Sequence, residues 1–383
     1  MTPAARISAA IDVLDKILAG QSAEHVLTAW GRSSRFAGSG DRAAVRDLVY
    51  DALRCRRSFA ALGGGETGRH LILGGLRAAG QDGKDIFTGE GYAPAPVGPS
   101  DAGREPDDVE EWDLPDWLIP KFQASLGEQA FAIAQSLQQR APVFLRVNLG
   151  RCRPDQAIRS LAEDQIVAVP HPLASSALEV TSGQRKIQNC RAYLSGQVEL
   201  QDAASQAVIE MLPLKDGMKV LDHCAGGGGK TLAMAARAKL GLFAHDISPR
   251  RMKDLPERAK RAGIKVTLTE TPERNAPYDL VLADVPCSGS GSWRRDPQGK
   301  WSLNEKTFSD LLTVQAGILD RISAMVSRGG TLAYATCSVL SEENSLQIRD
   351  FLERSPQWRL VAQRQFTPLD GGDGFFVAYL TQG

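Results

Sequence analysis

The stretch YDLVLADVPCSGSG, residues 278–291, constrains the fold of this chain more than any other. It begins with a mostly apolar run that proline and glycine then stop, which is typical of a central parallel strand covered on both faces. The carboxyl ends of such strands carry the functional groups of α/β folds. We therefore predict a buried strand over 278–283 that presents Asp284 and Cys287 at the functional edge of a sheet. The alternative for Cys287 is a purely structural role as a small buried residue.

Strand and helix patterns alternate regularly around this stretch. Strands are predicted over 219–222, 242–246, 264–268, 278–283 and 331–336, and helices over 203–211, 230–239, 249–262 and 304–327. A βαβ series of this kind folds into a doubly wound parallel sheet. The predicted fold class is therefore α/β, with a Rossmann-like domain over 201–383.

The first 200 residues show other patterns. Apolar residues at helical spacing predict a helical domain over 1–137, interrupted by a Gly-, Pro- and Asp-rich loop near 80–113. The arginines of 54–57 fit a solvated helix end better than a phosphate contact. Residues 141–200 combine strand and helix patterns, so we predict a small α/β lobe there.

Composition limits the class of protein. A length of 383 residues suits two or three domains, and no apolar run reaches the roughly 20 residues of a membrane span. The six cysteines are scattered without a CxxC pair, which argues against a metal site and favours free thiols in a reducing, cytoplasmic setting. A formal net charge of zero weakens a nucleic-acid interpretation without excluding it.

A glycine-rich turn, DHCAGGGGKT over 222–231, follows the first predicted strand of the alternating series. Glycines at this place let the backbone approach a ligand at a helix N-terminus. A Walker phosphate loop needs glycine where Cys224 stands, and the spacing does not match the dinucleotide fingerprint cleanly. S-adenosylmethionine remains, because Asp246 lies at the end of the second strand, where a carboxylate can bind ribose hydroxyls.

With these residues in view, the chain resembles the Sun/RsmB-type RNA cytosine-5 methyltransferases over essentially its whole length. CAGGGGKT at 224–231 resembles the family's cofactor turn, DVPC at 284–287 its Asp-x-Pro-Cys motif, and YATCS at 334–338 its Thr-Cys-Ser motif. The helical N-terminus looks like the NusB-like domain of the rRNA-directed members, a looser match. The family's proline in the cofactor turn is replaced by Gly227, and its acidic residue for adenine has only Glu270 as a stand-in.

The resemblance implies methylation of cytosine C5 in RNA, with 16S rRNA or a small-subunit assembly intermediate as the expected partner of a monomeric enzyme. It assigns nucleophilic attack on C6 to Cys337, stabilisation of the base to Asp284 and release of the product to Cys287. The residues themselves do not decide which cysteine attacks. Lys230 is expected either to lower a thiol pKa or to position Asp284 or the cofactor turn. The residues implied for binding the cofactor are Cys224, Ala225, Gly226, Gly227, Gly228, Gly229, Lys230, Asp246 and Asp284.

Three other activities remain as alternatives. A tRNA cytosine-5 methyltransferase would use the same motifs. An exocyclic-amine methyltransferase would need an aromatic residue where Cys287 stands. A non-catalytic RNA-binding ribosome assembly factor would not need intact thiols. Residues 293–295, Trp-Arg-Arg, either clamp the substrate strand or pack their loop onto the domain.

Overall fold

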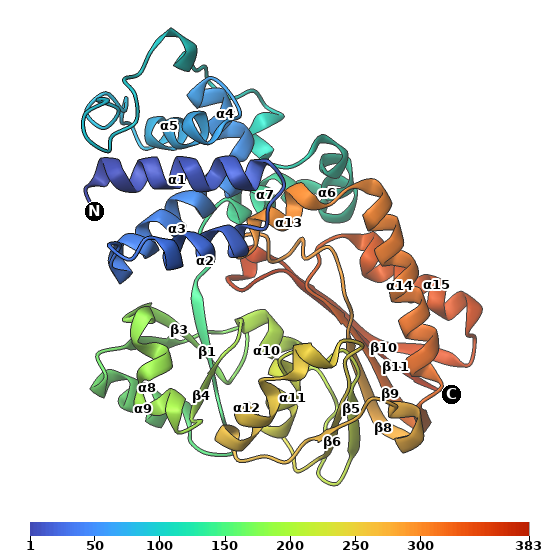
Figure 1. The fold of residues 1–383 in the computed structure, drawn as a ribbon. Helices are drawn as coiled ribbons and strands as arrows, with labels where there is room; N and C mark the ends of the chain where they lie inside the picture. The colour runs from blue at the N-terminus through green and yellow to red at the C-terminus, as the bar shows by residue number, and fades with distance from the viewer. Residues whose placement is uncertain (383) are drawn as a thin grey trace. The chain divides into compact units, whose positions relative to one another are not determined.

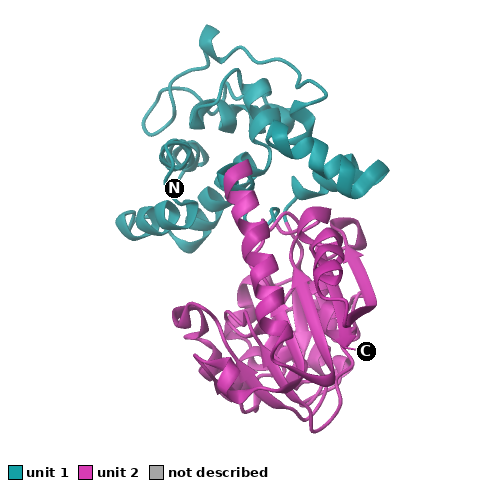
Figure 2. Ribbon diagram, turned by 90° about the vertical axis from the view of Figure 1, so that its right-hand side faces the viewer, with its two compact units in different colours: residues 1–140, 293–303 teal, residues 141–292, 304–383 magenta. Residues whose placement is uncertain are grey.

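The computed structural model of this chain describes residues 1–382, which form two compact units (Figure 2). The first unit contains residues 1–140 and 293–303, and the second contains residues 141–292 and those from 304 onward. A short segment from the middle of the predicted Rossmann-like domain therefore belongs to the N-terminal unit.

The first unit is helical. Its α-helices are α1 (Pro3–Leu18), α2 (Ala23–Ser33), α3 (Ser39–Arg54), α4 (Arg56–Gly63), α5 (Gly68–Ala78), α6 (Ile119–Leu126), α7 (Ala130–Leu137) and α13 (Pro297–Ser302). Helices α1, α3 and α5 share a core that includes Leu14, Val49 and Leu71. Helices α4 and α5 pack so closely that a Cβ at Gly74 would lie 1.9 Å from the carbonyl oxygen of Phe59. No helix within residues 1–382 is long and apolar enough to cross a membrane.

Segment 293–303 completes the interior of this helical unit. Trp293 is 1% exposed and stacks on Phe122, with ring centroids 5.9 Å apart. The Lys300 Nζ donates to the carbonyl oxygen of Arg54 at 2.7 Å, and the Arg54 Nε donates to the carbonyl oxygen of Arg294 at 2.8 Å. The predicted solvated helix end is therefore wrong for Arg54, whose side chain is buried because its guanidinium holds this segment.

The second unit begins with a small lobe. Its elements are β1 (Val143–Val147), α8 (Pro154–Glu163), β2 (Val167–Pro170), β3 (Ala177–Ser182), α9 (Arg191–Leu194) and β4 (Val198–Leu200). The four strands form an antiparallel sheet in the order β2-β3-β1-β4, which is a split βαβ arrangement (Figure 1). Residues 141–200 thus contain the strands and helices that the sequence pattern predicts.

A seven-stranded sheet forms the rest of the second unit, in the order β10-β11-β9-β8-β5-β6-β7. Its elements are α10 (Ala203–Glu210), β5 (Lys219–Asp222), α11 (Gly229–Ala235), β6 (Gly241–Ala244), α12 (Leu255–Ala262), β7 (Thr267–Leu268), β8 (Tyr278–Asp284), α14 (Glu305–Ser323), β9 (Val326–Thr336), α15 (Ser345–Arg354), β10 (Trp358–Phe366) and β11 (Phe375–Gln382). Strands β5 to β9 pair in parallel, while β10 and β11 add an antiparallel hairpin at one edge. The sheet is therefore mixed, and its parallel part is the predicted one.

The boundary between α14 and β9 differs from the prediction. The helix ends at Ser323, and the strand begins at Val326, whereas the apolar pattern predicts helix to residue 327. Met325 and Val326 are buried in the same core as strand β8. Apolar residues are expected at buried positions of a strand and of a helix alike, so the pattern does not distinguish the two. Gly329 has φ +74° and lies within β9, where the register with β8 shifts. It forms an irregularity in the strand and does not end the helix.

Candidate active site

The predicted reactive groups follow neighbouring parallel strands. Asp222 ends β5, Asp284 ends β8, and Cys337 directly follows β9; Asp246 lies two residues beyond β6. Because these strands pair in parallel, their carboxyl ends lie along one edge of the sheet. Figure 1 shows β5, β6, β8 and β9 side by side in this sheet. The four side chains therefore lie along one edge of the sheet.

Two thiols meet at this edge. The Sγ atoms of Cys287 and Cys337 are 3.4 Å apart, close enough to share a hydrogen bond. The hydrogen bond to Cys337, then burial, then the negative charge of Glu343 raise the pKa of Cys287 well above its ordinary value. Cys287 therefore keeps its proton at neutral pH and can donate it to the Cys337 sulfur.

Glu343 links the two cysteine loops. Its side chain is buried, and its carboxylate accepts hydrogen bonds from the backbone N–H of Ser288 at 2.7 Å and from the hydroxyls of Ser288 and Ser338 at 2.5 Å. The Gln315 Nε2 donates to the same carboxylate at 3.0 Å. Because Ser288 follows Cys287 and Ser338 follows Cys337, one buried carboxylate fixes both loops. The sequence gives no role to Glu343, since only the folded loops bring these donors together.

Two glycines bring a third segment to Cys337. The backbone N–H of Gly291 donates to the Cys337 carbonyl oxygen at 2.9 Å, and that of Gly374 donates to the Gly291 carbonyl oxygen at 2.8 Å. A Cβ on Gly291 would lie 2.1 Å from the Gly374 carbonyl oxygen. The backbones can approach this closely only because both residues lack a side chain.

Lys230 and Asp284 form an ion pair beside the thiols. The Lys230 Nζ donates to Asp284 Oδ2 at 2.6 Å and lies 4.7 Å from the centre of the Phe375 ring. The lysine side chain is 8% exposed, while that of Asp284 is 32% exposed. Of the roles expected for Lys230, this contact supports the positioning of Asp284.

The glycine turn and Asp246 form one connected structure. The backbone N–H of Gly226 donates to Asp246 Oδ2 at 3.0 Å, and the backbone N–H of Ser248 donates to Oδ1 at 2.9 Å. Gly226 and Gly228 have φ values of +50° and +78°, which favour glycine. Ile247, beside Asp246, is 88% exposed and offers an apolar surface that the sequence pattern does not single out. A carboxylate, an open glycine backbone and an exposed apolar side chain fit the ribose and the flat base of S-adenosylmethionine.

Burial strongly affects the ionisable groups under this turn. Asp222 is 0% exposed, and burial raises its pKa to about 6, although its Oδ2 accepts a hydrogen bond from Thr231 Oγ1 at 2.6 Å. Its Oδ1 has no hydrogen-bond partner within residues 1–382. Burial also raises the pKa of Cys224 to about 12, so this thiol stays protonated at neutral pH. Cys224 therefore shapes the turn as an uncharged group.

Some predicted residues lie elsewhere. Glu270 is exposed on the segment after β7. Trp293 and Arg294 are buried in the helical unit. Their loop is therefore packed, and it packs within the helical unit instead of onto the Rossmann-like domain. No group of three or more His, Cys, Asp or Glu side chains within residues 1–382 is arranged to hold a metal ion.

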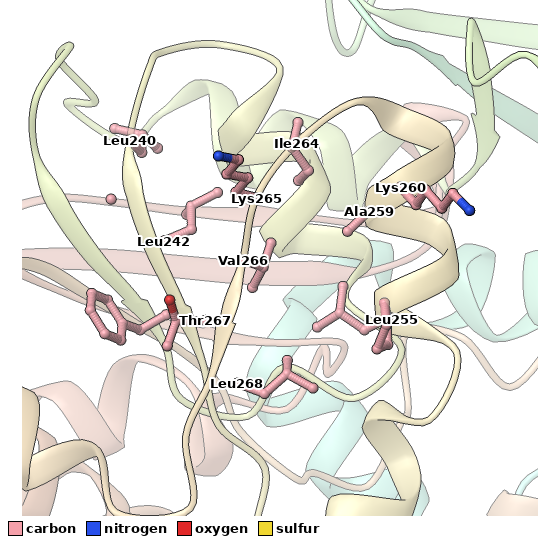
Figure 3. A pocket seen from close by; sticks show the side chains of 13 residues that line it. Leu240, Leu242, Leu255, Ala259, Lys260, Ile264, Lys265, Val266, Thr267 and Leu268 are labelled. Carbon is pink, nitrogen blue, oxygen red and sulfur yellow. The ribbon is translucent and has the colours of Figure 1, made fainter.

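A wide groove of about 720 Å³ contains none of the predicted catalytic residues. Figure 3 shows it among α12, β6 and β7, with apolar side chains such as Leu242, Leu255 and Val266 around it and Lys260 and Lys265 beside them. It lacks a carboxylate and a thiol, so it does not fit the cofactor or the methyl-transfer chemistry.

Comparison with protein families gives two matches. Residues 209–381 match the family described as "16S rRNA methyltransferase RsmB/F", and residues 114–186 match the "Methyltr_RsmF/B-like, ferredoxin-like domain". The first match covers the seven-stranded sheet with both cysteine motifs. The second covers most of the lobe and the two helices before it.

Curated relatives and solved structures agree with these matches. The chain is 36% identical over 282 residues to the "Ribosomal RNA small subunit methyltransferase B" of Citrobacter koseri, covering 70% of this chain and 66% of that protein. The protein of that name from Escherichia coli is 34% identical over 284 residues, with the same shares covered. The chain thus spans just under two thirds of the length of these relatives.

Among solved structures, PH0851 covers 100% of this chain and 99% of its own, with a TM-score of 0.78 and 23% identity. The structure of NSun6 from Pyrococcus horikoshii, solved with SFG, covers 70% of this chain and 98% of its own, with a TM-score of 0.62 and 18% identity. At these identities the likeness concerns the fold alone. With its lobe, its sheet and its paired cysteine motifs, the chain matches the RsmB/F family over residues 114–186 and 209–381.

Proposed function

We propose that this protein transfers a methyl group from S-adenosylmethionine to carbon 5 of a cytosine in small-subunit ribosomal RNA. The observation that carries the proposal is the 3.4 Å separation of two thiols at the ends of adjacent strands, beside the ion pair of Lys230 and Asp284. The names of the relatives support ribosomal RNA as the substrate.

Carbon 5 of cytosine is too weak a nucleophile to take a methyl group unaided, so the ring must first be activated. In the proposed reaction the Cys337 thiolate adds to carbon 6, and the new C–S bond turns the ring into an enamine. Carbon 5 would then form a bond to the methyl group as the bond between that methyl group and the sulfonium sulfur breaks, with the electron pair staying on the sulfur. Cys287 suits the opposite role, because its raised pKa disfavours the thiolate that attack requires.

Asp284 is proposed to bind the cytosine edge near nitrogen 3 and to stabilise the charge that develops there during addition. Its Oδ2 is occupied by Lys230, which leaves Oδ1 for the base. Lys230 is proposed to position Asp284, since its side chain is buried and its ammonium pairs with that carboxylate at 2.6 Å.

Product release requires two further events, loss of the proton from carbon 5 and cleavage of the C–S bond to Cys337. Cys287 is proposed to assist this release as a general base. The Cys287 proton passes to the departing Cys337 sulfur, which lies 3.4 Å away, and the Cys287 thiolate so formed takes the proton from carbon 5.

The cofactor supplies an electrophilic methyl group on a sulfonium. Asp246 is proposed to bind its ribose hydroxyls, Ile247 to contact its adenine, and the turn of residues 224–230 to hold the methionine part against the N-terminus of α11. Asp284 borders the same site. Glu270 is a further proposed contact of the adenine, because it is exposed and follows β7.

The target cytosine must leave its stack to reach the thiols, which favours a loop or single-stranded region of RNA. We propose that the helical domain of residues 1–137 and the lobe of residues 141–200 bind RNA around that base, and that the catalytic domain of residues 201–383 acts as a monomer. Transfer RNA as the substrate and a non-catalytic role in ribosome assembly are the alternative proposals.

Two cysteine variants test the proposal. Purified Cys287→Ala and Cys337→Ala proteins are incubated with S-adenosylmethionine and either 16S rRNA or bulk tRNA, then run on a denaturing gel. We expect a covalent RNA adduct with Cys287→Ala on 16S rRNA and none with Cys337→Ala. The reverse pattern would exchange the two roles, and an adduct with tRNA alone would change the substrate. No adduct and no methyl transfer to either RNA by the unmodified protein would favour the assembly role.

A further inference from the structure

The glycine turn is held from outside by two arginines. The Arg258 Nη1, on α12, donates to the carbonyl oxygen of Gly227, and the Arg146 Nη1, on β1, donates to that of Gly229 at 2.7 Å. Both carbonyls belong to the turn that is proposed to hold the cofactor. A charged donor makes a stronger hydrogen bond to a carbonyl than a neutral donor does.

Glu199 fixes the orientation of Arg258. Its carboxylate is 7% exposed, and its Oε1 lies 3.5 Å from the Arg258 Nη2. Its Oε2 accepts a hydrogen bond from Arg261 Nη2 at 2.7 Å. The guanidinium of Arg258 thus bridges a buried carboxylate on β4 and the backbone of the turn, so it connects the lobe to the turn in addition to the direct contact of Arg146.

Gly227 leaves room for this guanidinium. It differs from Gly226 and Gly228, whose positive φ values favour glycine, because its own φ lies outside that region. A Cβ built on Gly227 would lie 2.9 Å from the Arg258 Nη1, which is closer than real Cβ contacts allow. The backbone therefore does not require glycine at 227, and a Cβ there would meet only the flexible end of the Arg258 side chain.

We propose that Arg258 is the positioning residue that sets the conformation of the cofactor turn. The proposal rests on the proposed function in one respect, that this turn binds S-adenosylmethionine.

The test measures binding of S-adenosylhomocysteine by calorimetry, with no RNA present. We expect Arg258→Ala to weaken binding about tenfold, the effect of losing one charge-assisted hydrogen bond that orders the turn. Gly227→Ala should weaken binding less than Arg258→Ala does, because its Cβ shifts only the end of the Arg258 side chain. The double variant should bind no more weakly than Arg258→Ala, since no guanidinium is left for the Cβ to meet.

Arg261→Ala is the matched control. It removes a second arginine from the same helix and the same carboxylate, yet Arg261 makes no hydrogen bond to the turn, so binding should change less than about twofold. In methyl transfer, Arg258→Ala should raise the KM for S-adenosylmethionine while keeping kcat at saturation.

Three results would overturn the proposal. They are unchanged binding by Arg258→Ala, additive losses in the double variant, and a loss with Arg261→Ala as large as that with Arg258→Ala. If the unmodified protein binds S-adenosylhomocysteine but methylates no RNA, the proposed function fails and the test of Arg258 stands. If the unmodified protein does not bind it, the assignment of the turn fails as well.

Discussion

The free energy of unfolding of Asp222→Asn minus that of the unmodified protein should be larger at neutral pH than at acidic pH. Asp222 is fully buried, and burial raises its pKa from 3.8 to about 6. The folded state therefore binds this proton more tightly than the unfolded state does. Below pH 3.8 the group is protonated in both states, so its ionisation does not lower the free energy of unfolding. The loss of free energy grows as the pH rises and is complete above about pH 6.

The magnitude follows from the two pKa values. A shift from 3.8 to about 6 corresponds to about 3 kcal/mol at full ionisation. Between pH 5 and pH 8 the cost increases by about 1.4 kcal/mol, because part of it is already present at pH 5. The hydrogen bond from Thr231 is included in this shift, since it favours the charged form and lowers the pKa.

Urea unfolding followed by circular dichroism at pH 5, 6, 7 and 8 measures this difference. The free energy of unfolding of Asp222→Asn minus that of the unmodified protein should increase by about 1.4 kcal/mol over this range. Contributions that do not depend on pH, such as an amide N–H left without a partner, cancel in this comparison. Thr231→Val should make the pH dependence of the unmodified Asp222 steeper.

Asp216→Asn is the control, because it removes an exposed carboxylate from the same unit. A difference for Asp222→Asn that stays constant from pH 5 to pH 8, or that falls, would refute the link between burial and the raised pKa.

Three further results are expected. Burial lowers the pKa of Lys300 to about 8, so the unmodified protein should gain stability relative to Lys300→Met as the pH rises from 8 to 10.5 in urea unfolding, and a loss would contradict this. Burial raises the pKa of Cys224 to about 12, so iodoacetamide at pH 8 should not label this residue in the folded protein, as read by mass spectrometry. Gly291→Ala should lower methyl transfer at least about tenfold, since its Cβ cannot fit against Gly374 without moving the loop of Cys337; full activity would show that the loop adapts.

The parallel sheet and the edge that carries the chemistry could be predicted from the sequence. Apolar runs stopped by glycine or proline mark buried strands, and the groups that follow them must lie together because parallel strands end at one edge. Cys287 and Cys337 are 50 residues apart along the chain and 3.4 Å apart in space for this reason.

Contacts that depend on loop conformation could not be predicted. Glu343 stands next to Glu342 in the sequence, and nothing in the pattern indicates which carboxylate is buried among four donors. The end of α14 was missed because apolar residues such as Met325 suit a helix and a strand equally. Arg258 lies among other basic residues in its helix, so the sequence does not distinguish it from an ordinary surface arginine.

Segment 293–303 is the largest difference between pattern and structure. Its sequence, WRRDPQGKWSL, has the polar and basic composition of a surface loop. In the structure Lys300 is buried and hydrogen-bonded to a residue 246 positions away. A partner so distant in the chain leaves no trace in local periodicity.

This segment also affects how the helical unit folds during translation, because it is made after the helices that it packs against. Residues 1–140 leave the ribosome before residue 293 is translated, and at roughly 5–20 residues per second the delay is on the order of 10 s. During that interval Phe122 lacks the ring of Trp293, and the carbonyl oxygen of Arg54 lacks the ammonium of Lys300. The nascent helical unit therefore lacks part of its core until segment 293–303 is translated. Shortened chains that stop before residue 293 should accordingly be held by chaperones or degraded.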